Sequence, residues 1–223
     1  MANHCIPPNK LEALIFDVDG VLVDSMAYHA DAWIQTFSEI GINITRQQIY
    51  DIEGSNHVGV IEKIFKHAAR RPQPHHFEDL HNRKQELFFQ TQKVKVFRGM
   101  DDCLGRLNDA YHLAVASGSD RRIVDKLINT FFPDTFDVII SGADVTHGKP
   151  SPEPYLKVIE KLGVLKDRCI VIENAPLGVE SAKNAGLYCV AVPTHVSPAS
   201  LKKADVVFED HEALKEYLYD LVI

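Results

Sequence analysis

Short runs of apolar residues, separated by longer amphipathic stretches, set the strongest limit on how this chain can fold. Polar residues follow the runs, which recur at six places: 11–16, 113–116, 138–140, 169–172, 189–192 and 205–208. Apolar, β-branched runs of this length are typical of strands buried on both faces. Helical periodicity predicts helices between them: 100–108, 120–131, 153–162, 178–185 and 211–221. The alternation predicts an α/β fold with a doubly wound, Rossmann-like parallel sheet.

The segment from residue 25 to residue 96 interrupts this alternation. It contains no strand-like run, and amphipathic patterns predict helices instead: 26–40, 58–69 and 77–92. Arg71-Pro72-Gln73-Pro74 separates the last two helices, because proline breaks a helix. We therefore expect a helical cap domain over residues 25–96, inserted after the first strand of a core formed by residues 1–24 and 97–223. The alternative is that these helices belong to a single domain.

Composition narrows the classes of function. A formal net charge of −7 argues against general nucleic-acid binding, which favours basic surfaces. No apolar run approaches the ~20 residues that a membrane-spanning helix needs. Residues 1–10 lack the apolar centre of a signal peptide, so we expect a cytoplasmic protein with neither a membrane nor a nucleic-acid partner. The sequence leaves the oligomeric state open.

The four cysteines form no Cys-x-x-Cys pair, so the sequence does not favour a metal-binding or redox role for them. Two of them stand inside apolar runs. We therefore expect reduced, buried, small hydrophobic side chains at Cys5, Cys103, Cys169 and Cys189.

Two carboxylates, Asp17 and Asp19, follow the first apolar run directly. Gly20 allows the chain to turn sharply there, so both can face one small cavity. One carboxylate can attack phosphorus and form an aspartyl phosphate. The other can protonate the leaving group and later activate water. The alternative is an Asp-rich turn at a strand end, which the apolar residues on both sides disfavour.

Three further polar motifs follow later runs. Ser117-Gly118-Ser119-Asp120 opens a helix, where free amides and a hydroxyl bind phosphate. Lys149 precedes another helix and can neutralise negative charge. Glu173-Asn174 offers the hard oxygen ligands that suit Mg²⁺. Each motif alone also fits a helix cap or a solvated lysine. Because the carboxyl ends of parallel strands meet at one edge, we expect all three to share a site with Asp17.

Together these motifs resemble the haloacid dehalogenase superfamily, over nearly the whole chain from Leu11 onward. The resemblance is strongest to the branch with a helical cap after the first strand, which includes β-phosphoglucomutase and many small-molecule phosphatases. It implies that Asp17 is the nucleophile and that Asp19 is the acid/base. The family's dehalogenases lack the second aspartate, so Asp19 indicates phosphoryl transfer.

The same resemblance implies the other partners of the reaction. Ser117, with Gly118, and Lys149 would hold the transferring phosphoryl group. A magnesium ion would be bound by Asp17, by the backbone carbonyl of Asp19 and by the acidic pair, here Glu173-Asn174. Most relatives carry Glu-Asp at that pair. Asn174 keeps an oxygen ligand and removes one negative charge, so we expect weaker metal binding.

Residues of the expected cap determine which substrate the protein recognises. In the mutases of this branch, a cap arginine grips a second phosphate, whereas this chain has His57 in that stretch and no arginine. His57 is a partial substitute, because histidine is usually neutral at pH 7. Lys84 resembles the other basic cap residue of the branch. His29 and Trp33 match its first cap helix, where His29 can hydrogen-bond near the acid/base and Trp33 fits the cap interior.

Glu53, just before Gly54, resembles a residue of the branch members that hydrolyse inorganic pyrophosphate. It could reach the metal, or it could be an exposed carboxylate at a helix end. We expect a magnesium-dependent phosphohydrolase that acts on a small phosphorylated metabolite, either a sugar phosphate or pyrophosphate, through an aspartyl phosphate. A β-phosphoglucomutase-type sugar-phosphate mutase is the alternative, and a non-catalytic phosphate-binding protein is a third.

Overall fold

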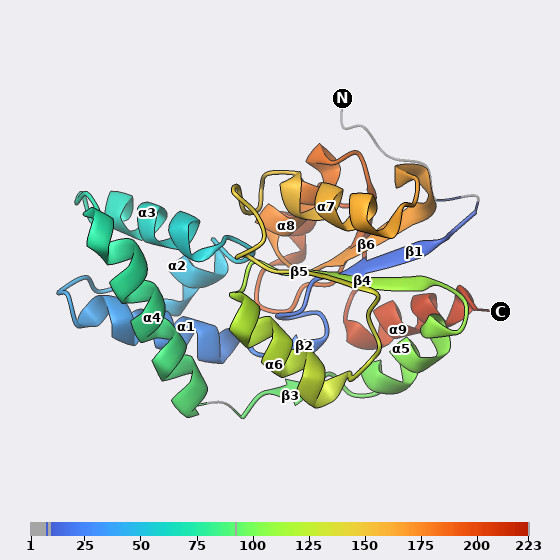
Figure 1. Ribbon diagram of the computed structural model, residues 1–223, viewed down its shortest axis with the longest axis horizontal. Coiled ribbons are helices and arrows are strands. Elements are labelled where there is room, and N and C mark those ends of the chain that lie inside the picture. The colour runs from blue at the N-terminus through green and yellow to red at the C-terminus, as the bar shows by residue number, and fades with distance from the viewer. Residues whose placement is uncertain (1–7, 9, 92, 223) are drawn as a thin grey trace.

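A six-stranded sheet forms the centre of the computed structural model, which describes Pro8, residues 10–91 and residues 93–222 (Figure 1). All its pairs are parallel, in the order β5-β4-β1-β6-β7-β8. The strands are β1 (Ala13–Phe16), β4 (His112–Ala116), β5 (Val138–Ile140), β6 (Cys169–Glu173), β7 (Tyr188–Ala191) and β8 (Val206–Val207). Strand β1 lies between β4 and β6, where the direction of strand addition reverses. The Rossmann-like fold predicted from the apolar runs is confirmed.

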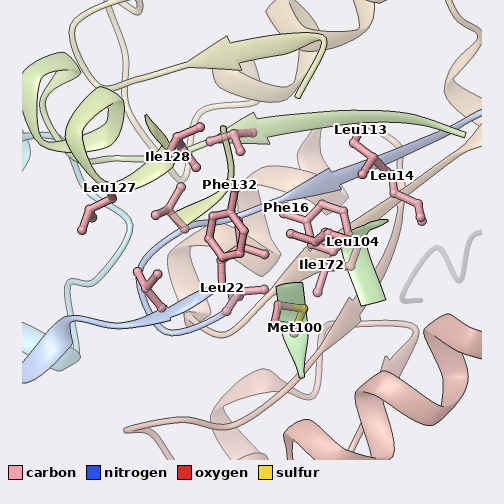
Figure 2. Close-up of a cluster of buried hydrophobic side chains, with 14 of the residues drawn as sticks. Leu14, Phe16, Leu22, Met100, Leu104, Leu113, Leu127, Ile128, Phe132 and Ile172 are labelled. Carbon is pink, nitrogen blue, oxygen red and sulfur yellow. The ribbon is translucent and has the colours of Figure 1, made fainter. Parts of the chain in front are cut away.

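Helices cover both faces of the sheet (Figure 1). On one face lie α7 (Glu153–Leu162) and α8 (Pro176–Asn184), and on the other α5 (Met100–Asn108), α6 (Arg121–Phe131) and α9 (His211–Asp220). The side chains of β1 alternate between these layers. Leu14 and Phe16 join the cluster of α5, α6 and α9 shown in Figure 2, whereas Ala13 and Ile15 join that of α7 and α8. Burial of both faces explains the unbroken apolar runs. Two 3-10 turns complete the layers: η1 (Lys166–Arg168) and η2 (Pro198–Leu201).

Four helices gather beyond the carboxyl ends of the strands (Figure 1). They are α1 (Met26–Ser38), α2 (Arg46–Tyr50), α3 (His57–His67) and α4 (Pro74–Thr91). Their apolar side chains form a cluster of their own around Trp33, Phe37 and Phe65. Helix α2 is new, since five residues are too few to show a period, and a capping box between Thr45 and Gln48 begins it. The predicted end of α4 at Gln92 lies outside the described residues.

One very short strand, β3 (Lys95–Val96), corrects the expectation that residues 25–96 hold no strand. Strand β2 (Val23–Asp24) pairs antiparallel with β3 (Lys95–Val96), so that Val23 faces Val96. Two residues give no readable alternation, which is why the sequence pattern missed them. The pair places the two connections between the α1–α4 helices and the sheet side by side.

The described cysteines, Cys103, Cys169 and Cys189, are free and buried, as expected, while Cys5 lies outside the described residues. No helix in the described part of the chain combines the length and the apolar character needed to cross a membrane.

Candidate active site

Asp17 and Asp19 lie just beyond the carboxyl end of β1, and both are nearly buried. The amide of Asp17 donates a 3.0 Å hydrogen bond to the carbonyl of Ile172, which continues the β1–β6 pairing by one residue. The chain then turns at Gly20, where φ is +88°. A side chain there would overlap the amide of Asn174, so both backbone angle and space require glycine. The turn aims both carboxylates at one edge of the sheet.

Lys149 joins the first aspartate to the end of β6. Its ammonium nitrogen lies 2.5 Å from Oδ1 of Asp17 and 2.6 Å from Oε1 of Glu173, and only 3% of the residue is exposed. The interpretation as a solvated lysine is therefore wrong. Glu173 is held further by the hydroxyl of Tyr155, which donates to Oε1 at 2.6 Å. Tyr155 was not foreseen, because its helix begins only after the Lys149 loop.

The charges around Asp17 oppose one another. Burial, together with the negative charges of Glu173 and Asp19, raises the pKa of Asp17 to about 7 against the lowering effect of Lys149. Burial lowers the pKa of Lys149, but the charges of Asp17 and Glu173 outweigh it and raise that pKa. The protein alone thus holds more negative charge here than Lys149 neutralises.

Asp19 accepts hydrogen bonds from three side chains. Oδ1 accepts from the Ser25 hydroxyl at 2.5 Å and lies 2.9 Å from Nε2 of His29, and Oδ2 accepts from the Ser119 hydroxyl at 2.6 Å. Burial raises the pKa of Asp19, but His29 and the two serines lower it below its ordinary value. The hydroxyl of Ser117, which was predicted to hold the phosphoryl group, lies farther away, 3.5 Å from Oδ2.

His29 and Lys84 continue this chain of contacts away from Asp19. The ammonium of Lys84 lies 2.7 Å from Nδ1 of His29. An ammonium can only donate, so Nδ1 accepts and the ring carries its proton on Nε2, toward Asp19. Burial and the charge of Lys84 lower the pKa of His29, which keeps the ring neutral, and burial lowers the pKa of Lys84 to about 8.

Glu53 reaches across from the α1–α4 helices to the sheet. Its Oε1 accepts a 2.6 Å hydrogen bond from the side-chain amide of Asn174, and only 6% of the residue is exposed. This burial excludes an exposed carboxylate at a helix end. The N-cap position of α8 is Ala175, which excludes a capping role for Asn174. Burial first, and then the charges of Asp17, Glu173 and Asp19, raise the pKa of Glu53 well above its ordinary value.

These side chains meet around a cavity of about 60 Å³ between the α1–α4 helices and the sheet. Its lining includes Asp17, Asp19 and Glu53, together with His57 and Trp33. Gly118 stands in the wall against Gly54, where a side chain would overlap a backbone carbonyl. Besides His57, the structure brings the other ten predicted site residues to this cavity or into direct contact with its carboxylates: Asp17, Asp19, His29, Glu53, Lys84, Ser117, Gly118, Lys149, Glu173 and Asn174. His57 lines the cavity as well.

Residues 14–192 match the family model of haloacid dehalogenase-like hydrolases. The chain belongs to this family. Protein CbbY of Rhodobacter capsulatus is 30% identical, with 83% of this chain and 86% of that protein covered. The phosphorylated carbohydrates phosphatase of Thermotoga maritima is 29% identical, over 79% of this chain and 82% of its own. A CbbY variant from Rhodobacter sphaeroides, solved in complex with xylulose 1,5-bisphosphate, superposes with a TM-score of 0.76 at 26% identity and covers 90% of this chain and 95% of that one.

The donor set of this haloacid dehalogenase-like hydrolase fits a magnesium ion. Buried Oδ1 of Asn174 and Oε2 of Glu53 have no hydrogen-bond partner in the part of the chain that the structure describes, although such oxygens nearly always have one. Together with Asp17 and Asp19 they supply hard oxygen atoms, which Mg²⁺ prefers. Among the described residues, no three His, Cys, Asp or Glu side chains form a closed metal cage. Mg²⁺ does not need one, because it keeps several waters and shares its ligands with phosphate.

Some residues of the site could not be found by motif alone. Ser119 and Asp19 both lay within recognised motifs, but the hydrogen bond between them was not foreseen. His81 and Gln85 also line the cavity. His81 stands three positions before Lys84 and four before Gln85, so helix spacing was the signal that could have linked it to either residue.

Proposed function

We propose that this haloacid dehalogenase-like hydrolase removes the phosphoryl group from a small phosphorylated metabolite, such as a sugar phosphate, through an aspartyl phosphate on Asp17. The observation that carries the proposal is the meeting of two unlike carboxylates at one cavity. Asp17 contacts Lys149, whereas Asp19 lies within a set of hydroxyl and imidazole donors. The Thermotoga maritima relative, a phosphorylated carbohydrates phosphatase, supports this class of substrate.

The first half of the reaction transfers the phosphoryl group to the protein. A carboxylate oxygen of Asp17 attacks phosphorus as the bond to the leaving oxygen breaks, and Asp19 gives that oxygen its proton. The arriving anionic phosphoryl group raises the pKa of Asp19 by charge repulsion, which lets this carboxyl carry the proton. Lys149, in contact with Asp17, and the hydroxyl of Ser117 stabilise charge on the phosphoryl oxygens.

The second half releases phosphate. Asp19, now ionised, takes a proton from water, and the oxygen of that water attacks the phosphorus of the aspartyl phosphate. Inorganic phosphate leaves and Asp17 is free again. The Nε2–H of His29, held in place by Lys84, points to Asp19 in both halves and fixes the direction of its carboxyl group.

Magnesium fits this reaction as the resident cofactor, held by Asp17, Asp19 and Asn174 with Glu173 behind them. When bound, it neutralises negative charge shared by the carboxylates and the substrate. Burial first, and then the negative charges of Glu173 and Asp19, raise the pKa of Asp17, and a bound cation would oppose both effects.

We further propose that residues 25–96 act as a cap domain that opens and closes. Ligand sites usually measure ~300–1,000 Å³, so a cavity of about 60 Å³ has no room for a sugar phosphate. The α1–α4 helices must move away for entry and return to exclude bulk water. The β2–β3 pair is the natural hinge.

The free, buried cysteines among the described residues support a further proposal, that the protein works in the reducing cytoplasm.

Inorganic pyrophosphate is a second candidate substrate, and Glu53 favours it. Oε2 of this carboxylate has no partner among the described residues, while Oε1 accepts from Asn174, so Oε2 can help bind the cation that a highly charged substrate brings. A Glu53→Ala change that removes pyrophosphate hydrolysis and spares hexose phosphates would support this candidate.

The test is a substrate screen with the purified protein and Mg²⁺. Sugar phosphates, phosphoglycolate, pyrophosphate and an aryl phosphate are compared, following both phosphate release and isomer formation. We expect phosphate release that is lost by at least about a thousandfold in Asp17→Asn, with the fold unchanged. Isomerised sugar phosphate without free phosphate would instead establish the mutase alternative. Turnover retained by Asp17→Asn contradicts the nucleophile assignment.

A further inference from the structure

The backbone carbonyl of Gly20 is held by a side chain that comes from another part of the sheet. The hydroxyl of Thr194 donates a 2.6 Å hydrogen bond to it. Thr194 lies in the loop between β7 and η2, residues 192–197, whereas Gly20 belongs to the turn of residues 17–23 that carries the two aspartates (the catalytic turn). Strand β6 lies between β1 and β7, so the catalytic turn has crossed the end of β6 before it meets Thr194. The direction of the turn is therefore fixed partly from outside it.

A second donor reaches the same carbonyl. Nε2 of His211, the first residue of α9, lies 3.1 Å from the oxygen of Gly20. A carbonyl can only accept, so Nε2 carries the proton. The ring of His211 stacks on that of Phe97, which follows β3 directly, with the centroids 3.7 Å apart. Loss of the Thr194 hydroxyl would thus leave the Gly20 carbonyl with one side-chain donor, which favours a shifted turn over an unfolded one.

The residue next to Thr194 contacts the α1–α4 helices. The ring of His195 stacks on that of Tyr50, the last residue of α2, with the centroids 4.8 Å apart and 16° between the planes. Nε2 of His195 lies 3.7 Å from Oδ1 of Asp24 on β2, too far for a hydrogen bond. Among the residues that the structure describes, this buried nitrogen has no hydrogen-bond partner. The stack on Tyr50, rather than a hydrogen bond from Nε2, therefore orients the ring.

A single peptide group joins the two contacts. It is planar and keeps the Cα atoms of Thr194 and His195 about 3.8 Å apart, so a shift of one residue is passed to the other. Thr194, His195 and Tyr50 are not among the described residues that line the cavity. An effect of these three residues on turnover therefore passes through the catalytic turn and not through direct contact with the substrate.

We propose that Thr194 is a positioning residue of the catalytic turn, acting through the carbonyl of Gly20, and that His195 makes this hold depend on the stack with Tyr50. The hydroxyl of Thr194 then fixes the direction of Asp19 when the α1–α4 helices lie against the sheet, and loses its hold when Tyr50 moves away. The inference rests on the proposed phosphohydrolase function and on the proposed closing movement. Its consequence is that the acid/base becomes aligned only where bulk water is excluded.

The first test separates the hydroxyl of Thr194 from the shape of its side chain. Thr194→Val keeps the branched side chain and removes the donor, so we expect kcat for an aryl phosphate to fall by roughly tenfold, while KM changes less. Thr194→Ser keeps the donor and should recover most of kcat. The matched control is Thr130→Val: the hydroxyl of Thr130 also donates to a backbone carbonyl at 2.6 Å, that of Lys126 on the exposed side of α6, and its loss should leave kcat unchanged.

The second test is a double-mutant cycle between Tyr50 and Thr194. Tyr50→Ala removes the stack and should lower kcat severalfold in the wild-type background. In Thr194→Val it should change kcat little, because the contact that it supports is already gone. Tyr50→Phe keeps a ring against His195 and should behave as the wild type. Gln47→Ala changes an exposed side chain elsewhere on α2 and is the matched control, with thermal unfolding to check that each variant is folded.

The carbonyl carbon of Gly20 gives a readout that needs no turnover, since its NMR shift reports the hydrogen bonds that it accepts. In the substrate-free protein we expect Thr194→Val and Tyr50→Ala to move this shift in the same direction and Gln47→Ala to leave it unchanged. A shift that stays at its wild-type value in Tyr50→Ala would overturn the inference.

Aryl phosphate turnover by the wild type separates the two proposals. Without it the phosphohydrolase function fails, and the carbonyl shift alone decides whether the stack on Tyr50 controls the catalytic turn. With it, a wild-type kcat in Thr194→Val, no recovery in Thr194→Ser, or losses that simply multiply in the double variant would each overturn the inference.

Discussion

Glu53 and Asn174 are joined by a 2.6 Å hydrogen bond, although one stands before α3 and the other follows β6. The bond connects the α1–α4 helices directly to the edge of the sheet. It also holds two oxygens that lack a partner among residues 10–91 and 93–222, Oε2 of Glu53 and Oδ1 of Asn174, close to the buried carboxylates. The balance of charge at this contact can be tested by changing Asn174 to a carboxylate, alone and together with a change of Glu53 to an amide.

Asn174→Asp should destabilise the metal-free protein and increase its response to Mg²⁺. The change replaces the donor to Glu53 with a like charge, which costs about 1–3 kcal/mol, or roughly 2–4 °C in unfolding temperature for each kcal/mol. Thermal unfolding with and without Mg²⁺ measures both effects. The matched control is the double variant Glu53→Gln, Asn174→Asp, which restores an amide–carboxylate pair and should recover the metal-free stability. Equal Mg²⁺ responses in wild type and Asn174→Asp would contradict the assignment of Asn174 to the metal.

Lys84→Met should lower kcat/KM by about tenfold or more, because it leaves Nδ1 of His29 buried and without a donor. Lys84→Gln can still donate through its amide and should retain more activity. The comparison separates the hydrogen bond from the charge. Steady-state kinetics on the same substrate, with circular dichroism to check the fold, provides the measurement. Equal losses in both variants would show that charge alone matters.

Gly118→Ala should prevent the α1–α4 helices from closing, because the added carbon would overlap the carbonyl oxygen of Gly54. Backbone atoms on both sides leave little room for adjustment. We expect a raised KM and a larger radius in small-angle scattering. Gly105→Ala is the control: nothing lies near its added carbon, and alanine stabilises the interior of α5 by about 0.5–1 kcal/mol. An unchanged scattering profile in Gly118→Ala would contradict closure at this contact.

Glu153 stabilises the loop that carries Lys149, and pH should reveal it. Its carboxylate accepts from the amides of Thr146 and His147, both at 2.8 Å, and these bonds, that of Thr146 first, lower its pKa from 4.5 to about 2. A lowered folded-state pKa means that the stabilisation is complete above about pH 4.5 and is lost as the pH falls through about 2. Glu153→Gln should therefore be less stable than the wild type at pH 7, by up to about 1 kcal/mol after screening by solvent.

Urea unfolding of wild type and Glu153→Gln at several pH values checks this prediction. The difference between the two should shrink steadily below pH 4.5. A difference that stays constant down to pH 2 would mean that the carboxylate charge does not stabilise the loop.

The sequence predicted the sheet and the strand-end residues because burial on both faces leaves a plain apolar run, and polar residues mark where it stops. Asp17, Lys149 and Glu173 could be brought together on that argument alone. The hydrogen bond from Ser119 to Asp19 could not, because it depends on how a loop turns. The contact of His81 with Asp120 depends on where α4 meets α6, a tertiary relationship that no local pattern contains.

The β2–β3 pair has a consequence for how such enzymes diversify. Because Val23 faces Val96, the polypeptide leaves and rejoins the sheet at neighbouring points. A segment anchored in this way can be exchanged as a cassette without moving Asp17 or Lys149. Replacing the segment between these two valines with that of a relative should transfer the relative's substrate preference while Asp17 and Lys149 keep their positions.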